Sequence, residues 1–125
     1  MPARIEVGRK GFRGCKRVGP SVAGALKVDC TKIRDPFHQK GALSVPVQLV
    51  AAKLEEVRQQ RFLDLVDQVV QGVLDDRVVY VFCMMGKNRS QAVAWRAREK
   101  IRQDHPCISF VGPVCLPGLV SRIPE

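Results

Sequence analysis

Short stretches of alternating or continuous apolar residues predict the strands of a small sheet. Residues 4–7 alternate charged and apolar side chains, the pattern of a strand with one buried face. Residues 25–30 predict a second strand, and a turn follows because the residue before Pro36 is steered away from the helical region. Residues 77–82, which are apolar at every position after Arg77, are typical of a strand buried on both faces, so we expect this strand to be central.

Two longer segments carry apolar residues at helical spacing. Between residues 47 and 74 the apolar side chains recur at steps of three and four. One five-residue step within this segment is compatible with a bend in one helix or with a break between two. Residues 90–103 return to the helical period, and residues 107–111 predict a last strand. The Gly- and Pro-rich end, residues 112–125, is expected to be an irregular tail.

Strands that alternate with helices predict the α/β class, here a small sheet with helices packed on it. A chain of 125 residues with 46% apolar composition has the size of one domain, so we predict a single domain with a core at about 4–111. No apolar run approaches the roughly 20 residues that cross a bilayer, and the first residues lack the apolar stretch of a secretory signal. We therefore expect a cytoplasmic protein with no membrane partner.

The five cysteines favour reduced thiols over a disulfide framework or a zinc site. Their number is odd, and none are paired at Cys-x-x-Cys spacing. No set of His, Cys and Asp residues has the spacing of metal ligands, so we expect no metal and no other cofactor. Four cysteines are expected to be small buried apolar residues: Cys15, Cys30, Cys107 and Cys115.

The net charge of +9 is concentrated toward the two ends of the chain. Residues 1–40 carry ten Lys and Arg against three acids, whereas residues 41–76 carry three against six. A positive face would attract phosphate-bearing partners such as RNA, although a merely solvated basic surface is an equal alternative. The candidate RNA-contacting residues follow the first predicted strand: Arg9, Lys10, Arg13, Lys16 and Arg17.

The most specific segment connects the central strand to the last helix. A tight strand-to-helix loop turns several backbone N–H groups toward one point, where the helix start adds partial positive charge. Gly86 supplies conformational freedom, and Arg89 offers a planar fork for two phosphate oxygens. Ser90 can cap the helix or bond to the side chain at position 83. The predicted anion-binding residues are Cys83, Met84, Met85, Gly86, Lys87, Asn88, Arg89 and Ser90.

The Cys-x5-Arg order is similar to the loop of cysteine-dependent protein phosphatases, in which a thiolate attacks phosphorus and the arginine holds the equatorial oxygens. This resemblance covers eight residues. It implies catalysis by Cys83 and Arg89, with Asp35 as the acid. The family's usual histidine before the cysteine is Phe82 here. We expect binding without catalysis and keep a phosphatase as the alternative.

A longer resemblance, over about residues 9–103, is to the C-terminal domain of the RapZ family of bacterial RNase adapter proteins. Three blocks match in order: residues 10–14, residues 28–36 and residues 83–90. The second block keeps the family's aspartate as Asp29. In the third block, two methionines replace the family's Thr-Gly pair, which makes the expected pocket wall bulkier and more apolar.

The resemblance to the RapZ family implies a ligand sensor or regulatory adapter. Such a domain binds an amino-sugar phosphate or a similar phosphometabolite, and it can contact RNA. We expect Arg13, Asp29 and His38 to surround the rest of that ligand. An RNA-binding module that uses only its basic face is a further alternative, and neither the oligomeric state nor the natural ligand follows from the sequence.

Overall fold

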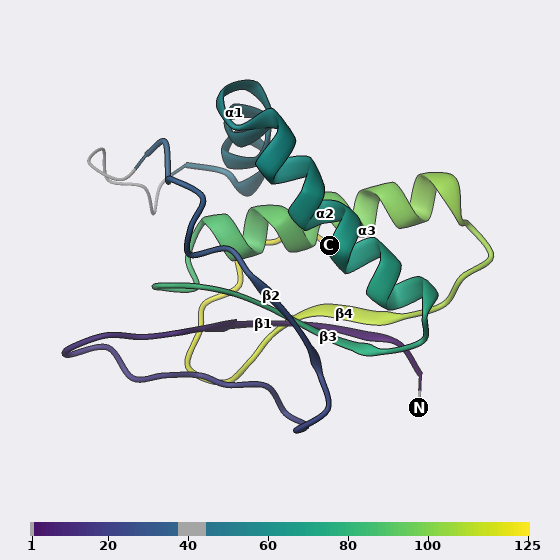
Figure 1. Ribbon diagram of the computed structural model, residues 1–125, viewed down its shortest axis with the longest axis horizontal. Coiled ribbons are helices and arrows are strands. Elements are labelled where there is room, and N and C mark those ends of the chain that lie inside the picture. Colours follow the sequence, from purple (N-terminus) through teal and green to yellow (C-terminus); the bar gives the residue numbers. More distant parts are fainter. Residues whose placement is uncertain (1, 38–44) are drawn as a thin grey trace.

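The computed structural model describes residues 2–37 and 45–125 (Figure 1). His38, one of the residues expected near a ligand, lies outside the described residues. The described elements are, in chain order, β1 (Arg4–Arg9), β2 (Leu26–Asp29), α1 (Val47–Val57), α2 (Gln59–Leu74), β3 (Val78–Cys83), α3 (Arg89–Asp104) and β4 (Val111–Cys115).

The strands form one parallel sheet in the order β2-β3-β1-β4, which confirms the predicted α/β class. β3 pairs with both β1 and β2, so the apolar run at 77–82 is an interior strand as expected. The three helices lie on one face of the sheet (Figure 1). Because all strands run the same way, their carboxyl ends meet at one edge, where open α/β sheets bind ligands.

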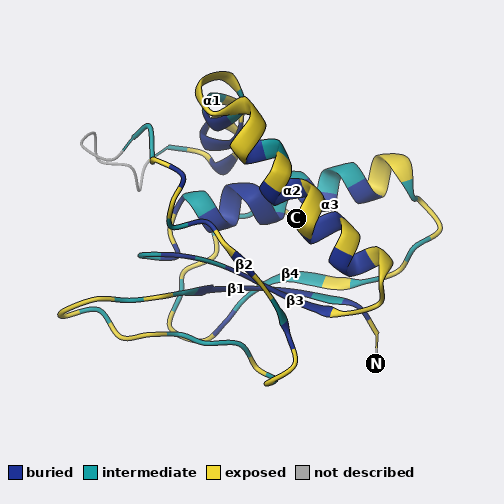
Figure 2. Cartoon of the chain, in the orientation of Figure 1, coloured by how far each residue is buried: buried dark blue, intermediate teal, exposed yellow. Residues whose placement is uncertain are grey.

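The core lies between the helices and one face of the sheet, and a loop covers the opposite face. Val79 and Val81 of β3 belong to the helix-side core together with Phe62 of α2. Tyr80 belongs to a second apolar cluster on the other face and stacks on Phe82, with ring centroids 5.3 Å apart. Figure 2 shows the buried inner faces of the helices and the buried interior strands. Burial on both faces explains why β3 lacks alternation in its sequence.

The long helical segment is broken at Arg58, which has non-helical dihedral angles of φ −137° and ψ 39°. The five-residue step in the apolar pattern therefore marks a break between two helices. Acidic side chains of the two helices lie on their exposed surface, as at Glu56, Asp64 and Asp67. No helix among the described residues is long and apolar enough to span a membrane.

The last strand was predicted too early in the chain, and the segment without helix or strand begins at residue 116 rather than at 112. β4 covers Val111–Cys115 rather than 107–111, and it pairs with β1 at the edge of the sheet. The Gly112-Pro113 pair has the composition of a turn, but an edge strand tolerates a proline because one side needs no ladder bonds. The C-terminal segment, residues 116–125, is also part of the packed structure, since Leu116 is buried and Ile123 packs against the helix-side core.

Burial of the cysteines differs from the expectation at three of the four positions. Cys30 is buried, Cys15 and Cys115 are half-buried, and Cys107 is exposed. Cys107 follows Pro106 in the surface connection between α3 and β4, which explains its exposure. All five described thiols, including the buried Cys83, are free.

A buried carboxylate fixes the loop that covers the second face of the sheet. Glu6 of β1 pairs with Arg4 at 2.8 Å and accepts the Ser21 N–H at 3.0 Å, and it also binds the Ser21 hydroxyl. Burial alone would raise the pKa of Glu6, but the hydrogen bonds from Ser21 and the Arg4 guanidinium outweigh burial and leave the pKa below its usual value. The charged form of Glu6 therefore holds this loop on the sheet.

Candidate anion-binding site

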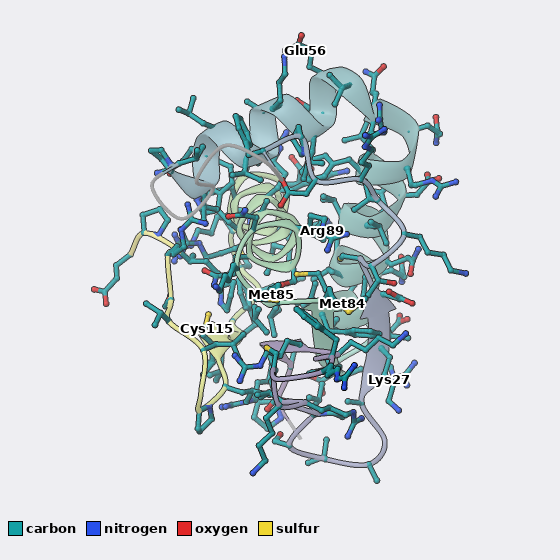
Figure 3. All side chains as sticks on the ribbon, turned by 90° about the vertical axis from the view of Figure 1, so that its left-hand side faces the viewer. Lys27, Glu56, Met84, Met85, Arg89 and Cys115 are labelled. Atoms are coloured by element: carbon teal, nitrogen blue, oxygen red, sulfur yellow. The ribbon has the colours of Figure 1, made fainter. Side chains whose placement is uncertain are left out.

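The loop of residues 83–90, called the Cys83 loop below, leaves the carboxyl end of β3 and leads into α3. Its neighbour in the sheet, β1, continues into a connection that covers the opposite face, whereas β3 continues into a helix. Adjacent strands whose connections depart to opposite faces form the crevice where α/β sheets bind ligands. Figure 3 looks onto this edge, where Met84 and Met85 lie between the β2 side, marked by Lys27, and the β4 side, marked by Cys115.

The Cys83 loop curls around a sulfur atom. Cys83 Sγ accepts the Gly86 N–H at 3.2 Å. It also lies 3.1 Å from Ser90 Oγ, and either the thiol or the hydroxyl can donate in this contact. Gly86 has a φ of 71°, and a Cβ there would lie 2.9 Å from the carbonyl oxygen of Gly8. Glycine at position 86 is therefore required both by the backbone and by the close approach of β1. Cys83 is only 2% exposed, so the loop covers its thiol.

Arg89 binds backbone rather than the mouth of the loop. Its Nη1 donates to the carbonyl oxygens of Thr31 at 3.0 Å and Ile33 at 2.9 Å. These carbonyls belong to the turn after β2, so Arg89 ties that turn to the start of α3. From the sequence we expected the guanidinium to bind a phosphate, whereas in the structure its Nη1 donates to these two backbone carbonyls.

Asn88 connects the loop to two other segments. Its Nδ2 donates to Asp35 Oδ2 at 3.1 Å, which brings the candidate acid of the phosphatase alternative next to the loop. Its Oδ1 accepts from Arg122 Nη1, which also donates to the carbonyl oxygen of Lys87 at 3.1 Å. Burial lowers the pKa of Arg122, with Asp35 acting in the opposite direction. An arginine keeps its charge in proteins, so Arg122 brings a cation from the C-terminal segment to the loop.

Gln91 joins the loop to the C-terminal segment. Its fully buried amide nitrogen donates to the carbonyl oxygens of Gly86 and Val120, both at 2.9 Å. Its amide oxygen accepts the Arg122 N–H at 2.7 Å. One side chain thus satisfies three backbone groups in two segments that are far apart in sequence, and it fixes the distance between the loop and the C-terminal segment.

A cleft of about 390 Å³ opens between the Cys83 loop and the C-terminal segment. Three of its lining residues are cationic, and they come from β1, the loop and the C-terminal segment. The remaining lining residues are glycines and apolar side chains, with no acid among them. The lining consists of Arg9, Met85, Gly86, Lys87, Gly118, Leu119, Val120 and Arg122. The cleft therefore combines positive charge with an apolar wall.

The structure brings only part of the predicted ligand site to the cleft. Met85, Gly86 and Lys87 line it. The other predicted residues of the loop do not: Cys83, Met84, Asn88, Arg89 and Ser90. Asp29 serves the turn after β2, because its Oδ1 accepts the N–H and the hydroxyl of Thr31 at 2.8 and 2.6 Å. Arg13 is exposed and is not among the lining residues.

Three contributors to the site were not predicted as such from the sequence. Gln91 had a detectable signal, since it lies with Ser90 on the inward face of a helix, where a buried polar group needs partners. Arg9 was predicted to contact RNA, and only the pairing of β1 with β3 brings it to the loop. Arg122 follows the loop by more than thirty residues, and no local pattern links the two.

The described residues contain no metal centre, because no three His, Cys, Asp or Glu side chains among them could hold an ion together. Comparison with known proteins adds no relative: no family model, no curated protein and no solved structure matches the chain.

Proposed function

We propose that the protein binds a phosphorylated small metabolite at the cleft, with the phosphate group among Arg9, Lys87 and Arg122, and that it does so without catalysis. The observation that carries the proposal is the cleft itself, with three cations and no acid in its lining at the ligand-binding edge of the sheet. The converging positive charge favours a multiply charged anion over a neutral ligand.

The three cations retain capacity for a ligand. Arg9 donates from Nε to the carbonyl oxygen of Lys16 at 2.6 Å and from Nη1 to that of Gly118 at 3.4 Å, and both bonds hold its guanidinium in place. A guanidinium has five N–H donors, so Arg9 and Arg122 can also contact phosphate oxygens. Lys87 is exposed and lies next to the start of α3, whose first N–H groups have no partner within the helix.

The apolar wall accounts for the organic part of the ligand. Met85, Leu119 and Val120 line the cleft beside the cations, and about 390 Å³ suffices for a small metabolite. The resemblance to the RapZ family supports an amino-sugar phosphate as the first ligand to test. The methionine in place of a small family residue favours a ligand with a larger apolar surface than a free sugar.

The positions of Cys83 and Arg89 support binding rather than phosphoryl transfer. Cys83 is 2% exposed and does not line the cleft, so an attacking thiolate would first need the loop to open. Nη1 of Arg89 donates to two backbone carbonyls of the neighbouring turn. A regulatory role as a ligand sensor fits a site that holds a phosphate group and does not expose a nucleophile.

Lys87→Ala tests the proposal in its simplest form. Lys87 is exposed and its side chain makes no hydrogen bond within the described residues, so its loss should not unfold the protein. The loss of one charge-assisted contact raises the dissociation constant by about tenfold. We expect this weakening for inorganic phosphate and for glucosamine 6-phosphate, measured by calorimetry and thermal shift at low ionic strength.

Lys27→Ala is the matched control for this experiment. It removes the same charge from an exposed position on β2, to the side of the loop in Figure 3. Its phosphate affinity should equal that of the wild type. Equal affinities for all three proteins, or no stabilisation of the wild type by either ligand, would contradict the proposed cleft.

RNA binding is a second candidate function, and it rests on a basic hairpin at residues 9–18. Backbone pairs between Arg9 and Val18 and between Phe12 and Cys15 close the hairpin, which projects from the carboxyl edge of the sheet in Figure 1. Phe12 is 52% exposed among the cations, which suits it for stacking on an unpaired base. The exposed cations of the hairpin are Lys10, Arg13, Lys16 and Arg17.

A salt titration of binding to a structured RNA tests this candidate. The affinity should fall steeply with salt, with a slope that decreases by about 0.7–0.9 for each lost phosphate contact. One variant replaces three hairpin cations with alanine: Arg13, Lys16 and Arg17. The control variant replaces three cations outside the hairpin: Lys27, Lys53 and Arg102. The same slope in both variants would show that the hairpin does not contact RNA.

A further inference from the structure

We propose that Cys30 and Cys83 form a reversible disulfide when the protein meets a hydroperoxide, so that the base of the Cys83 loop is a redox modification site. Bond formation does not depend on phosphate binding.

The strand register brings the two cysteines side by side. β2 and β3 are parallel, and the last registered pair of the ladder is Asp29 with Phe82. Cys30 and Cys83 are the next residues of the two strands, and the Cys30 N–H donates to the carbonyl oxygen of Phe82 at 2.8 Å, so the pairing continues to this point. Neighbouring strands lie about 4.8 Å apart, which is within the Cα separation of roughly 4.4–6.8 Å that a disulfide spans.

Both thiols also face the same way. Side chains at equivalent positions of paired parallel strands point to the same face, and Cys30 and Cys83 both belong to the buried cluster under the helices. The other cysteines are placed differently: Cys15 is in the hairpin, Cys107 is exposed after α3, and Cys115 is in β4, which β1 separates from β3. The fold therefore favours one pairing.

The reaction balances with the hydroperoxide as the oxidant. When the Cys83 loop opens, the Cys83 sulfur attacks the terminal peroxide oxygen and breaks the O–O bond. This leaves a sulfenic acid and releases water from hydrogen peroxide, or an alcohol from an organic hydroperoxide, after protonation. Cys30 then attacks the Cys83 sulfur, the S–S bond forms, and the sulfenic hydroxyl leaves with the Cys30 proton as water. Two thiols lose two electrons, and the peroxide gains them.

The surroundings assign the two roles. Burial and then the neighbouring Cys83 raise the pKa of Cys30 well above its ordinary value, so Cys30 is the protonated, resolving thiol. Cys83 Sγ instead accepts the Gly86 N–H and lies 3.1 Å from Ser90 Oγ, so polar groups of the loop already face the sulfur that reacts first. A disulfide with Cys30 would draw the Cys83 sulfur away from the Gly86 N–H and from Ser90 Oγ, and the shape of the loop would change.

Peptide mapping of the full chain under non-reducing conditions detects the bond directly. Trypsin releases Cys30 in the peptide Val28–Lys32 and Cys83 in the peptide Val78–Lys87. After exposure to hydrogen peroxide and blocking of free thiols, we expect these two peptides as one linked species that a reductant separates. Cys107 and Cys115 share a different tryptic peptide, so a bond between them cannot be mistaken for this one.

Cys30→Ala and Cys115→Ala are the paired controls. Cys30→Ala should abolish the linked species and allow the sulfenic acid of Cys83 to be oxidised further to sulfinic acid. Cys115→Ala should leave the linked species unchanged. The proposal is overturned if wild-type Cys83 is oxidised to sulfinic acid with no link to Cys30. If the link forms but the reduced protein does not bind phosphate, the disulfide stands and only the proposed function fails.

Discussion

Replacing Gln91 with methionine is expected to lower the free energy of unfolding by about 3–5 kcal/mol, although the side-chain volume is nearly kept. The substitution leaves the carbonyl oxygens of Gly86 and Val120 and the N–H of Arg122 without their partner. Each unsatisfied buried group costs about 1–3 kcal/mol, and losses of this size are rare for single substitutions. Urea denaturation of both proteins measures the difference.

The same variant should also weaken phosphate binding, because Gln91 sets the distance between the loop and the C-terminal segment that carries Arg122. Gln103→Ala is the control on the same helix. Gln103 is exposed near the end of α3, so its replacement should change stability by less than about 0.5 kcal/mol. A Gln91→Met protein as stable as this control would show that the C-terminal segment is not fixed to the loop.

Gly86→Ala is expected to destabilise the protein by about 2–4 kcal/mol and to disturb the cleft. The backbone at position 86 has a φ of 71°, which costs an alanine about 1–2 kcal/mol. Its Cβ would lie 2.5 Å from Leu119 Cδ2, 2.9 Å from the carbonyl oxygen of Gly8 and 3.2 Å from Arg9 Cβ. Leu119 can turn away at little cost, but the backbone of β1 cannot, so the loop must move.

Gly14→Ala separates the two contributions to this effect. Gly14 also has a positive φ, 83°, but a Cβ there would meet no atom within 4 Å. Thermal and urea unfolding should therefore show only the backbone contribution for Gly14→Ala and a larger loss for Gly86→Ala. Equal losses would mean that the approach of β1 to the loop is not as close as the structure shows.

Local patterns predicted most of the elements but not how the end of the chain is used. The apolar run at 77–82 and the helical spacing at 90–103 correspond to β3 and α3, because each pattern reflects burial by the element's own neighbours. The last strand was predicted at the wrong residues because Gly112 and Pro113, which lie within β4, are residue types typical of turns. The contacts of Arg122 with the loop join residues distant in sequence, which a local pattern does not encode.

In the candidate site, too, local roles were predictable from the sequence and contacts between distant residues were not. Gly86 and Ser90 have the roles that their residue types predict, because the tight loop dictates both locally. Arg89 was predicted as a phosphate ligand, but the structure gives its Nη1 two carbonyl acceptors in the turn after β2. The adjacency of Cys30 to Cys83 follows only from the strand register, and five unpaired cysteines in the sequence give no indication of it.

A titration of ¹⁵N-labelled protein with inorganic phosphate, followed by amide chemical shifts, tests the phosphate-binding cleft most directly. The amides of Met85, Gly86 and Lys87 should shift together with those of Leu119 and Arg122, along one saturating curve. The amides of β2 should stay in place, since that strand does not line the cleft. Shifts confined to the basic hairpin, or no saturating shifts in the Cys83 loop, would contradict phosphate binding at this site.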